Sequence, residues 1–125
     1  MRITSLAVIS IFISAVNAFA GPSAAKAKAQ ARCGWFDNPT PANVSLTDKD
    51  GEWLISKQGG YSAEGIEKLP EDFGDNWVET NGPHGYGCAC LTVRVNASEK
   101  KILSVLKSKV LPIRKCRNDR SLPKR

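Results

Sequence analysis

The chain has 125 residues and a formal net charge of +6, with 42% hydrophobic and 24% charged residues. This length suits a single domain, and the composition excludes a disordered chain. Ten Gly and seven Pro also exclude a long-helix or coiled-coil protein, so we expect one small globular unit whose limited core benefits from disulfides.

Charge is unevenly distributed along the chain. Residues 33–93 contain three Lys against ten Asp and Glu, a net charge of −7, whereas residues 94–125 contain eleven Lys and Arg against two acids, a net charge of +9. A nucleic-acid binder would not carry an acidic block in its middle. We therefore expect a dipolar protein with a solvated basic end and no nucleic-acid partner.

The first twenty residues have the pattern of a secretory signal peptide. The apolar run over residues 3–16 is shorter than the roughly 20 residues of a membrane span. Ala18 and Ala20 place small residues at the positions that a signal peptidase reads. The sequence thus predicts a periplasmic or secreted protein without stable membrane insertion, in which residues 21–32 form a flexible basic leader.

The folded domain is expected over residues 33–118, beginning at Cys33. Asn38-Pro39-Thr40-Pro41 predicts a packed, extended loop, because a residue that precedes proline avoids the helical region. Residues 47–51 form a turn that leads into a strand over residues 52–56.

An acidic segment separates this strand from the later ones. Residues 62–76 are acidic and interrupted by Pro70, so they have room for one short helical turn at 70–73. A short strand over 77–80 and a turn over 81–85 follow.

Two longer segments complete the predicted fold. In residues 86–96, apolar side chains alternate with the others, so we expect a strand with one apolar face. Residues 102–110 fit either a helix or a strand that returns beside residues 86–96, and we favour the strand. The predicted fold class is mainly β, a small antiparallel β domain held by two disulfides, with a basic tail over 119–125 that is only partly ordered.

The four cysteines are Cys33, Cys88, Cys90 and Cys116. In an exported protein they are expected to bond to one another. Cys88 and Cys90 share one strand face but lie too far apart to bridge, so each pairs with Cys33 or Cys116 and both pairings stay open. Zinc or Cys–His chemistry with His84 is disfavoured by the tight spacing and the oxidising compartment, so no metal or cofactor is expected.

Aromatic residues give the candidate binding surface. Trp35 stands beside Pro- and Asn-rich loops and Tyr86 stands between two glycines, positions from which exposed rings contact sugars or proteins. If these two aromatics belong to the core instead, the site is expected in the acidic segment 64–75. The candidate binding residues are Trp35, Asn38, Asn81, His84 and Tyr86.

Several short motifs together resemble a known family. They are CGWF at 33–36, NPTP at 38–41, DGEW at 50–53, QGG at 58–60 and GYGCAC at 85–90. The chain is similar over about residues 33–120 to a family of small secreted bacterial proteins known only as a domain of unknown function. The resemblance implies an exported bacterial domain and carries over no activity.

The functional prediction rests on the residues themselves. The chain has no nucleophile elbow and no phosphate-binding glycine loop, so we expect a non-catalytic periplasmic binding module whose partner is an envelope protein or glycan. Its sharpest form is an inhibitor or neutraliser of a basic envelope hydrolase or toxin, which the acidic block would complement in charge. The alternative is a small cell-envelope hydrolase that uses Glu52, Glu79 and His84.

Overall fold

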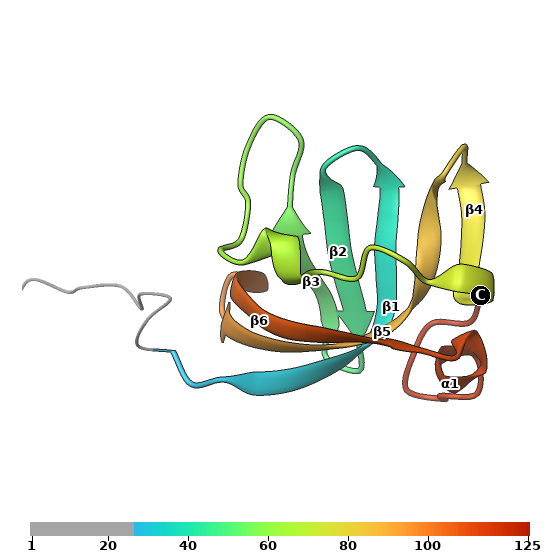
Figure 1. The fold of residues 1–125 in the computed structure, drawn as a ribbon. Helices are drawn as coiled ribbons and strands as arrows, with labels where there is room; N and C mark the ends of the chain where they lie inside the picture. Colours follow the sequence, from blue (N-terminus) through green and yellow to red (C-terminus); the bar gives the residue numbers. More distant parts are fainter. Residues whose placement is uncertain (1–26) are drawn as a thin grey trace, which may run out of the picture.

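The computed structural model describes residues 27–125 of the chain. The predicted signal peptide and the first half of the predicted leader, residues 21–26, lie outside the described residues. The described part contains six strands, two 3₁₀ turns and one short helix (Figure 1). Their bounds are β1 (Gln30–Thr40), β2 (Asn43–Asp48), β3 (Gly51–Ser56), η1 (Ile66–Lys68), η2 (Gly74–Asn76), β4 (Trp77–Asn81), β5 (His84–Asn96), β6 (Lys101–Leu111) and α1 (Ile113–Arg117).

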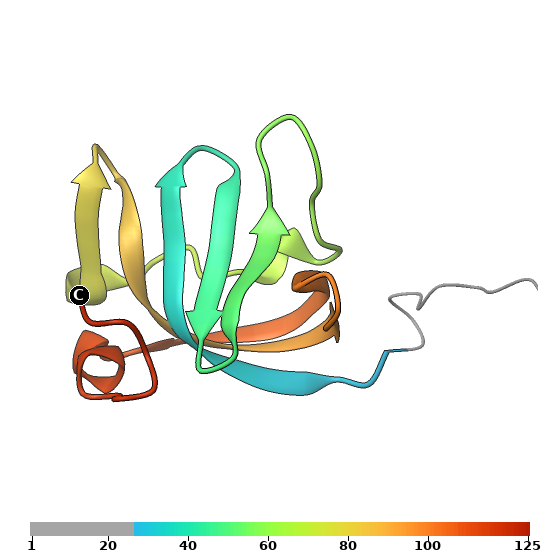
Figure 2. The ribbon, with the colours of Figure 1, turned by 180° about the vertical axis from the view of Figure 1, so that it is seen from behind.

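Five of the strands pair in a ring. β1 pairs with β2 and with β5, β2 pairs with β3, β3 pairs with β6, and β6 pairs with β5. The predicted class, mainly β with two disulfides, is confirmed, but the sheet is mixed because β3 and β6 run parallel where Leu54 faces Lys101. β4 pairs with the beginning of β5 outside the ring (Figures 1 and 2). Closure leaves few free strand edges in the ring.

β1 corrects two expectations from the sequence. Residues 38–40 of the segment expected as a packed loop form the end of this strand, since Asn38 pairs with Gly85 and Thr40 pairs with Asn43. Pro39 is tolerated because the pairing with β2 shifts register between Asp37 and Thr40, where no ladder donor is needed. The strand also begins at Gln30, so residues 30–32, assigned to the leader, pair with β5.

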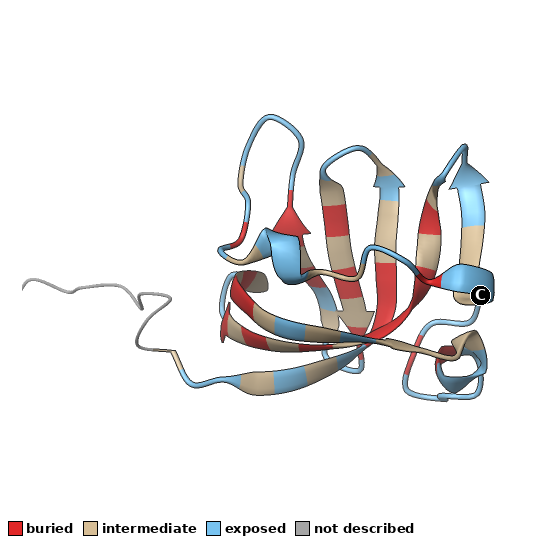
Figure 3. Ribbon diagram, viewed as in Figure 1, coloured by how far each residue is buried: buried red, intermediate tan, exposed pale blue. Residues whose placement is uncertain are grey.

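The main core fills the inside of the ring. The alternation predicted for residues 86–96 holds, because Ala89, Leu91 and Val93 are fully buried on one face of β5. Strand β6 confirms the strand favoured for residues 102–110 and contributes buried Ile102 and Val105. Buried bands alternate with less buried ones along these strands in Figure 3.

A second core lies on the outer face of β1 and β5. It consists of buried Trp35, Cys88, Cys116 and Leu122, with partly buried residues packed around them. The helix α1 and the segment after it cover this face, and the Trp35 indole Nε1 donates a hydrogen bond of 2.8 Å to the Pro123 carbonyl. The expected partly ordered tail over 119–125 is therefore wrong, because Leu122 is anchored in this core.

Two disulfides settle the pairing that the sequence left open. Cys33 bonds to Cys90, and Cys88 bonds to Cys116. The first joins neighbouring strands at positions directly opposite each other in the register of β1 and β5. The second ties β5 to α1 inside the second core.

The acidic segment between β3 and β4 also differs from its predicted form. The helical turn expected at 70–73 is absent from it, and the 3₁₀ turns η1 and η2 lie on either side of Pro70 instead.

Across residues 27–125, no helix is long and apolar enough to cross a membrane.

Candidate binding groove

A surface groove with a volume of about 450 Å³ lies between the 66–74 segment and strands β1 and β2. In Figure 1 this segment crosses in front of the upright strands on its way from η1 to η2. Phe36, Val44, Phe73 and Trp77 contribute apolar surface, Glu67, Glu71 and Asp72 contribute carboxylates, and Asn38 and His84 lie toward one end. We call this site the acidic groove.

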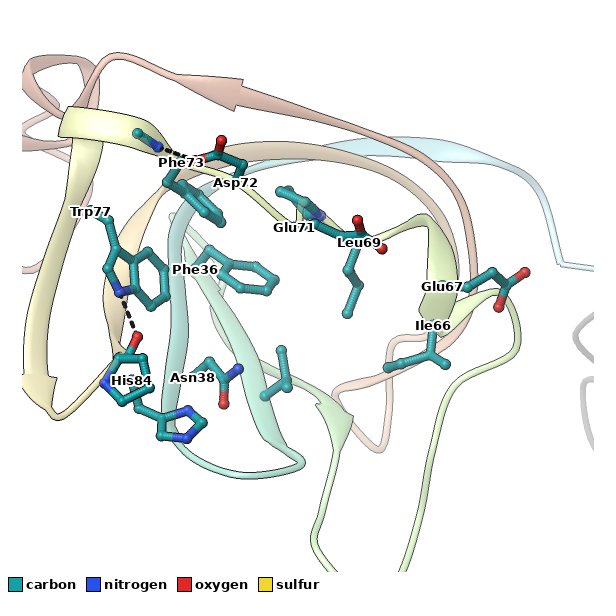
Figure 4. A pocket seen from close by; sticks show the side chains of 14 residues that line it. Phe36, Asn38, Ile66, Glu67, Leu69, Glu71, Asp72, Phe73, Trp77 and His84 are labelled. Atoms are coloured by element: carbon teal, nitrogen blue, oxygen red, sulfur yellow. Dashed lines mark hydrogen bonds between the residues drawn. The ribbon is translucent and has the colours of Figure 1, made fainter.

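Three aromatic rings form its floor (Figure 4). The ring centroids of Phe36 and Phe73 are 5.3 Å apart, and those of Phe73 and Trp77 are 4.8 Å apart. Trp77 is fixed further because its indole Nε1 donates a hydrogen bond of 3.0 Å to the Pro83 carbonyl. Rings in such contact stabilise one another, so the floor is a rigid apolar surface.

Two glycines allow the 66–74 segment to approach the ring of strands closely. A Cβ on Gly87 of β5 would lie 2.6 Å from the Phe73 ring, so only glycine lets that ring pack on the strand. Gly65 has a φ of +73°, and a Cβ there would lie 2.2 Å from the Val105 carbonyl oxygen. Both positions require glycine because a side chain would push the segment away from the strands.

Hydrogen bonds fix the segment at both ends. Near its start, the Glu64 amide donates to the Leu103 carbonyl at 3.0 Å, and the Val105 amide donates to the Glu64 carbonyl at 2.8 Å. Near its end, the Ile113 amide donates to the Asn76 side-chain oxygen at 3.0 Å. The wall of the acidic groove is thus anchored to β6 and to the beginning of α1.

The carboxylates of the groove are not neutralised by the part of the protein that the structure describes. Among residues 27–125, none of Glu67, Glu71 and Asp72 forms an ion pair, and no Lys or Arg side chain lines the groove. Within the described residues, the only hydrogen bond to these three side chains is one of 2.7 Å from the Gly74 amide to Asp72. Carboxylates beside aromatic faces are the groups that bind ammonium and guanidinium ions.

Two acids outside the groove, Asp48 and Asp50, serve the protein's own structure. Asp48 is buried and accepts hydrogen bonds from the Asp50 amide, the Trp53 indole and the Arg32 guanidinium. Burial lowers the pKa of Arg32, but its hydrogen bonds to Asp48 and Asp50 outweigh burial and raise the pKa above its ordinary value. The same bond from Arg32, followed by one from Lys49, lowers the pKa of Asp50.

The predicted binding residues fall into two groups. Asn38 and His84 line the acidic groove. Exposed Asn81 lies near it, and its side-chain amide donates to the Pro39 carbonyl at 3.3 Å.

Trp35 and Tyr86 lie elsewhere, in or against the second core. Trp35 is 0% exposed and contacts Tyr86 edge to face at a centroid distance of 5.4 Å. The prediction that Trp35 belongs to an exposed patch is therefore wrong. The outer face of β1 on which it lies is covered by the C-terminal segment, a contact that local sequence does not reveal.

Sequence reasoning missed the aromatic floor of the groove. Nothing in the sequence around Phe36 and Phe73 distinguishes residues that form the floor of a groove from ordinary core residues. The carboxylates were within reach, because the acidic segment 64–75 was the stated alternative if Trp35 and Tyr86 proved to be core. That segment contains five acids and one Lys.

The proposed hydrolase residues are only partly brought together. Glu79 pairs with Gly85, next to His84, whereas Glu52 lies on β3, which is not adjacent to β4 in the sheet. Within the described range 27–125, no group of three His, Cys, Asp or Glu side chains is placed to hold a metal ion.

Comparison with known proteins identifies a family. A family model described as Protein of unknown function (DUF4087) matches residues 27–123. Neither the curated proteins nor the solved structures contain a significant match to the chain.

Proposed function

The chain belongs to this family of proteins of unknown function, so its role has to be inferred from the acidic groove, and we propose that it is an exported, non-catalytic binding module. Its groove would hold a Lys or Arg side chain of a basic partner protein. The observation that carries this proposal is the combination of an aromatic floor with three carboxylates that form no ion pair within residues 27–125.

A cationic side chain matches this groove in shape and charge. Its aliphatic stem would lie on the half-buried Trp77 ring, and its charged end would reach Glu71 or Asp72. The same chemistry gives electrostatic steering toward a basic partner. A groove of about 450 Å³ accommodates one or two side chains rather than a folded domain, so the partner would insert a loop.

The compartment gives the partner class. The signal-peptide pattern of residues 1–20 and the two disulfides support an export compartment. Basic proteins of an export compartment include hydrolases that bind the anionic cell wall. We therefore propose that the protein inhibits or neutralises a basic envelope hydrolase or toxin.

The test is inhibition of a basic muramidase by the purified protein. We expect slower hydrolysis of peptidoglycan at low salt, and recovery of the rate as the ionic strength rises. The variant Glu67→Gln/Glu71→Gln/Asp72→Asn should weaken inhibition at least tenfold, because it removes the negative charge of the groove.

A matched control removes the same charge elsewhere. Glu52→Gln/Glu79→Gln/Glu99→Gln alters three exposed acids outside the groove lining and should leave inhibition unchanged. Equal loss in both variants would show that only net charge matters, and the groove would then have no specific role.

The alternative function, a small cell-envelope hydrolase, has one supporting observation. Glu79 faces the residue that follows His84 across the β4–β5 hairpin, which places an acid and an imidazole on one hairpin. If the wild-type protein cleaves peptidoglycan fragments and the control variant does not, the hydrolase replaces the binding module.

A further inference from the structure

The two disulfides occupy different environments. Cys33 is exposed and Cys90 is half-buried, whereas Cys88 and Cys116 are 1% and 3% exposed. Cys33 also lines a surface hollow of about 470 Å³, bordered by the basic residues Arg32 and Lys49 and the acidic residues Asp48 and Asp119. A hollow of this volume admits a molecule the size of a tripeptide. Cys88 and Cys116 border only a smaller hollow of about 190 Å³. The Cys33–Cys90 bond is thus the more accessible of the two to a reagent in the folded protein.

The exposed bond has short side chains beside it along the strands and a lysine on the neighbouring strand. On the outer face of the ring, the neighbouring pair of positions on β1 and β5 holds Ala31 and Thr92, which are too short to cover the sulfurs. On the other side of β5, Lys109 of β6 lies directly opposite Cys90 in the register. Directly opposite side chains have Cβ atoms about 5 Å apart, so the Lys109 ammonium can reach the Cys90 sulfur.

From this geometry we propose that the Cys33–Cys90 disulfide is a thiol-exchange site that takes small anionic thiols, with Cys33 as the modified residue. The thiolate sulfur of the incoming molecule bonds to the sulfur of Cys33. The Cys33–Cys90 bond breaks, and Cys90 leaves as a thiolate beside Lys109. The product carries a mixed disulfide on Cys33 and a free thiol on Cys90 once that thiolate takes a proton from water.

Lys109 favours this direction for two reasons. A cation beside a sulfur stabilises the thiolate, so Cys90 is the better leaving group. The hollow beside Cys33 carries two cations and two carboxylates, so Lys109 is the charge that attracts an anionic thiol. A second thiolate that attacks the outer sulfur of the mixed disulfide would release an oxidised small-molecule disulfide and leave Cys33 as a thiol.

The fold should survive this exchange. β1 and β5 are paired from Gln30 to Asn38 on β1, so they stay together without the bond. The buried Cys88–Cys116 bond keeps α1 and the second core in place. Exchange at Cys33 would therefore alter the outer surface of the barrel without releasing the acidic groove, and the inference does not rest on the proposed function.

The experiment uses the oxidised protein and reduced glutathione under native conditions. After acid quenching and alkylation, peptide mapping should find glutathione on Cys33, an alkylated Cys90 and an intact Cys88–Cys116 bond. The Cys33–Cys90 bond should open at least tenfold faster than the other. Equal rates for both bonds, no modification of the native protein, or glutathione on Cys90 would each overturn the proposal.

A pair of variants tests the role of Lys109. Lys109→Glu should slow the reaction with glutathione at least threefold, while Lys57→Glu makes the same charge change at an exposed position after β3 and should leave the rate unchanged. Near-ultraviolet circular dichroism establishes that both variants keep the fold. Equal rates in the two variants would remove Lys109 from the site.

Discussion

The two cores of this protein are built in different ways from the same strands. In the main core, alternate residues of β1, β5 and β6 meet inside the ring, and no covalent bond is needed to bring them together. In the second core, the opposite faces of β1 and β5 are covered by a C-terminal segment that a disulfide ties down. Phe36 belongs to the first and its neighbour Trp35 to the second.

The difference shows how a small domain buries both faces of a strand. Strand alternation alone buries one face and leaves the other to solvent. Here β5 buries Ala89 inward and Cys88 outward, because α1 and residues 118–125 cover the outer face near its beginning. The second core thus depends on a segment that contributes no strand. The following predictions distinguish what each core contributes to stability.

The largest effect is expected from Trp35→Ala. The substitution empties a fully buried position and removes the hydrogen bond to Pro123, so the free energy of unfolding should fall by about 3–5 kcal/mol. Urea titration followed by circular dichroism measures it. Half-buried Trp77→Ala is the control and should cost less; a loss for Trp35→Ala below that of Trp77→Ala would show that the second core contributes little.

The next effect concerns the buried disulfide. Cys88→Ala/Cys116→Ala should cost about 2–5 kcal/mol and should expose the chain around Arg117 and Arg120 to trypsin, because α1 loses its covalent tie. Cys33→Ala/Cys90→Ala is the matched variant. Its loop is longer, 57 against 28 residues, so the chain-entropy model gives it a slightly larger cost. Rapid C-terminal cleavage in this second variant would contradict the assignment of separate roles.

A smaller effect is expected where the groove segment touches the main core. Gly65 and Gly59 have nearly equal φ angles, +73° and +71°, but only an added Cβ on Gly65 meets another atom, the Val105 carbonyl. Gly59→Ala should cost about 1 kcal/mol for backbone conformation alone. Gly65→Ala should cost about 1–2 kcal/mol more because the segment must shift. Thermal unfolding measures the difference, and equal losses would mean that the segment moves freely.

The smallest effect is the pH dependence of two exposed acids, Asp50 beside the main core and Asp119 beside the second. Hydrogen bonds from Arg32 lower the pKa of Asp50, and those from Ser121 lower the pKa of Asp119. Both therefore stabilise the fold above the ordinary carboxyl pKa near 3.8, and that stabilisation is lost as the pH falls through the lower folded pKa values.

The test measures the free energy of unfolding of two variants, Asp50→Asn and Asp119→Asn, and compares each with the wild-type protein. This difference should be small at pH 7 and should shrink toward pH 2. A difference that stays constant over this range would contradict a contribution from the ionised carboxylates.

Local patterns in the sequence determined several strands of the ring and the number of disulfides. Alternation in residues 86–96 placed Ala89, Leu91 and Val93 on one face, and the same reasoning favoured a strand for residues 102–110. The cysteine count and spacing predicted two disulfides and excluded a bond between Cys88 and Cys90. These features depend on neighbours in the chain, so they can be recognised in the sequence itself.

Only the tertiary structure decided which aromatics are exposed and which disulfide pairing forms. Trp35 has the local surroundings of a loop residue, but its hydrogen-bond partner Pro123 is 88 positions away. The acidic groove likewise arises because the 66–74 segment lies across β1 and β2 and brings Phe73 onto Phe36. Contacts between residues so distant in sequence follow from the closure of the ring and the path of the chain over it, and no local pattern specifies them.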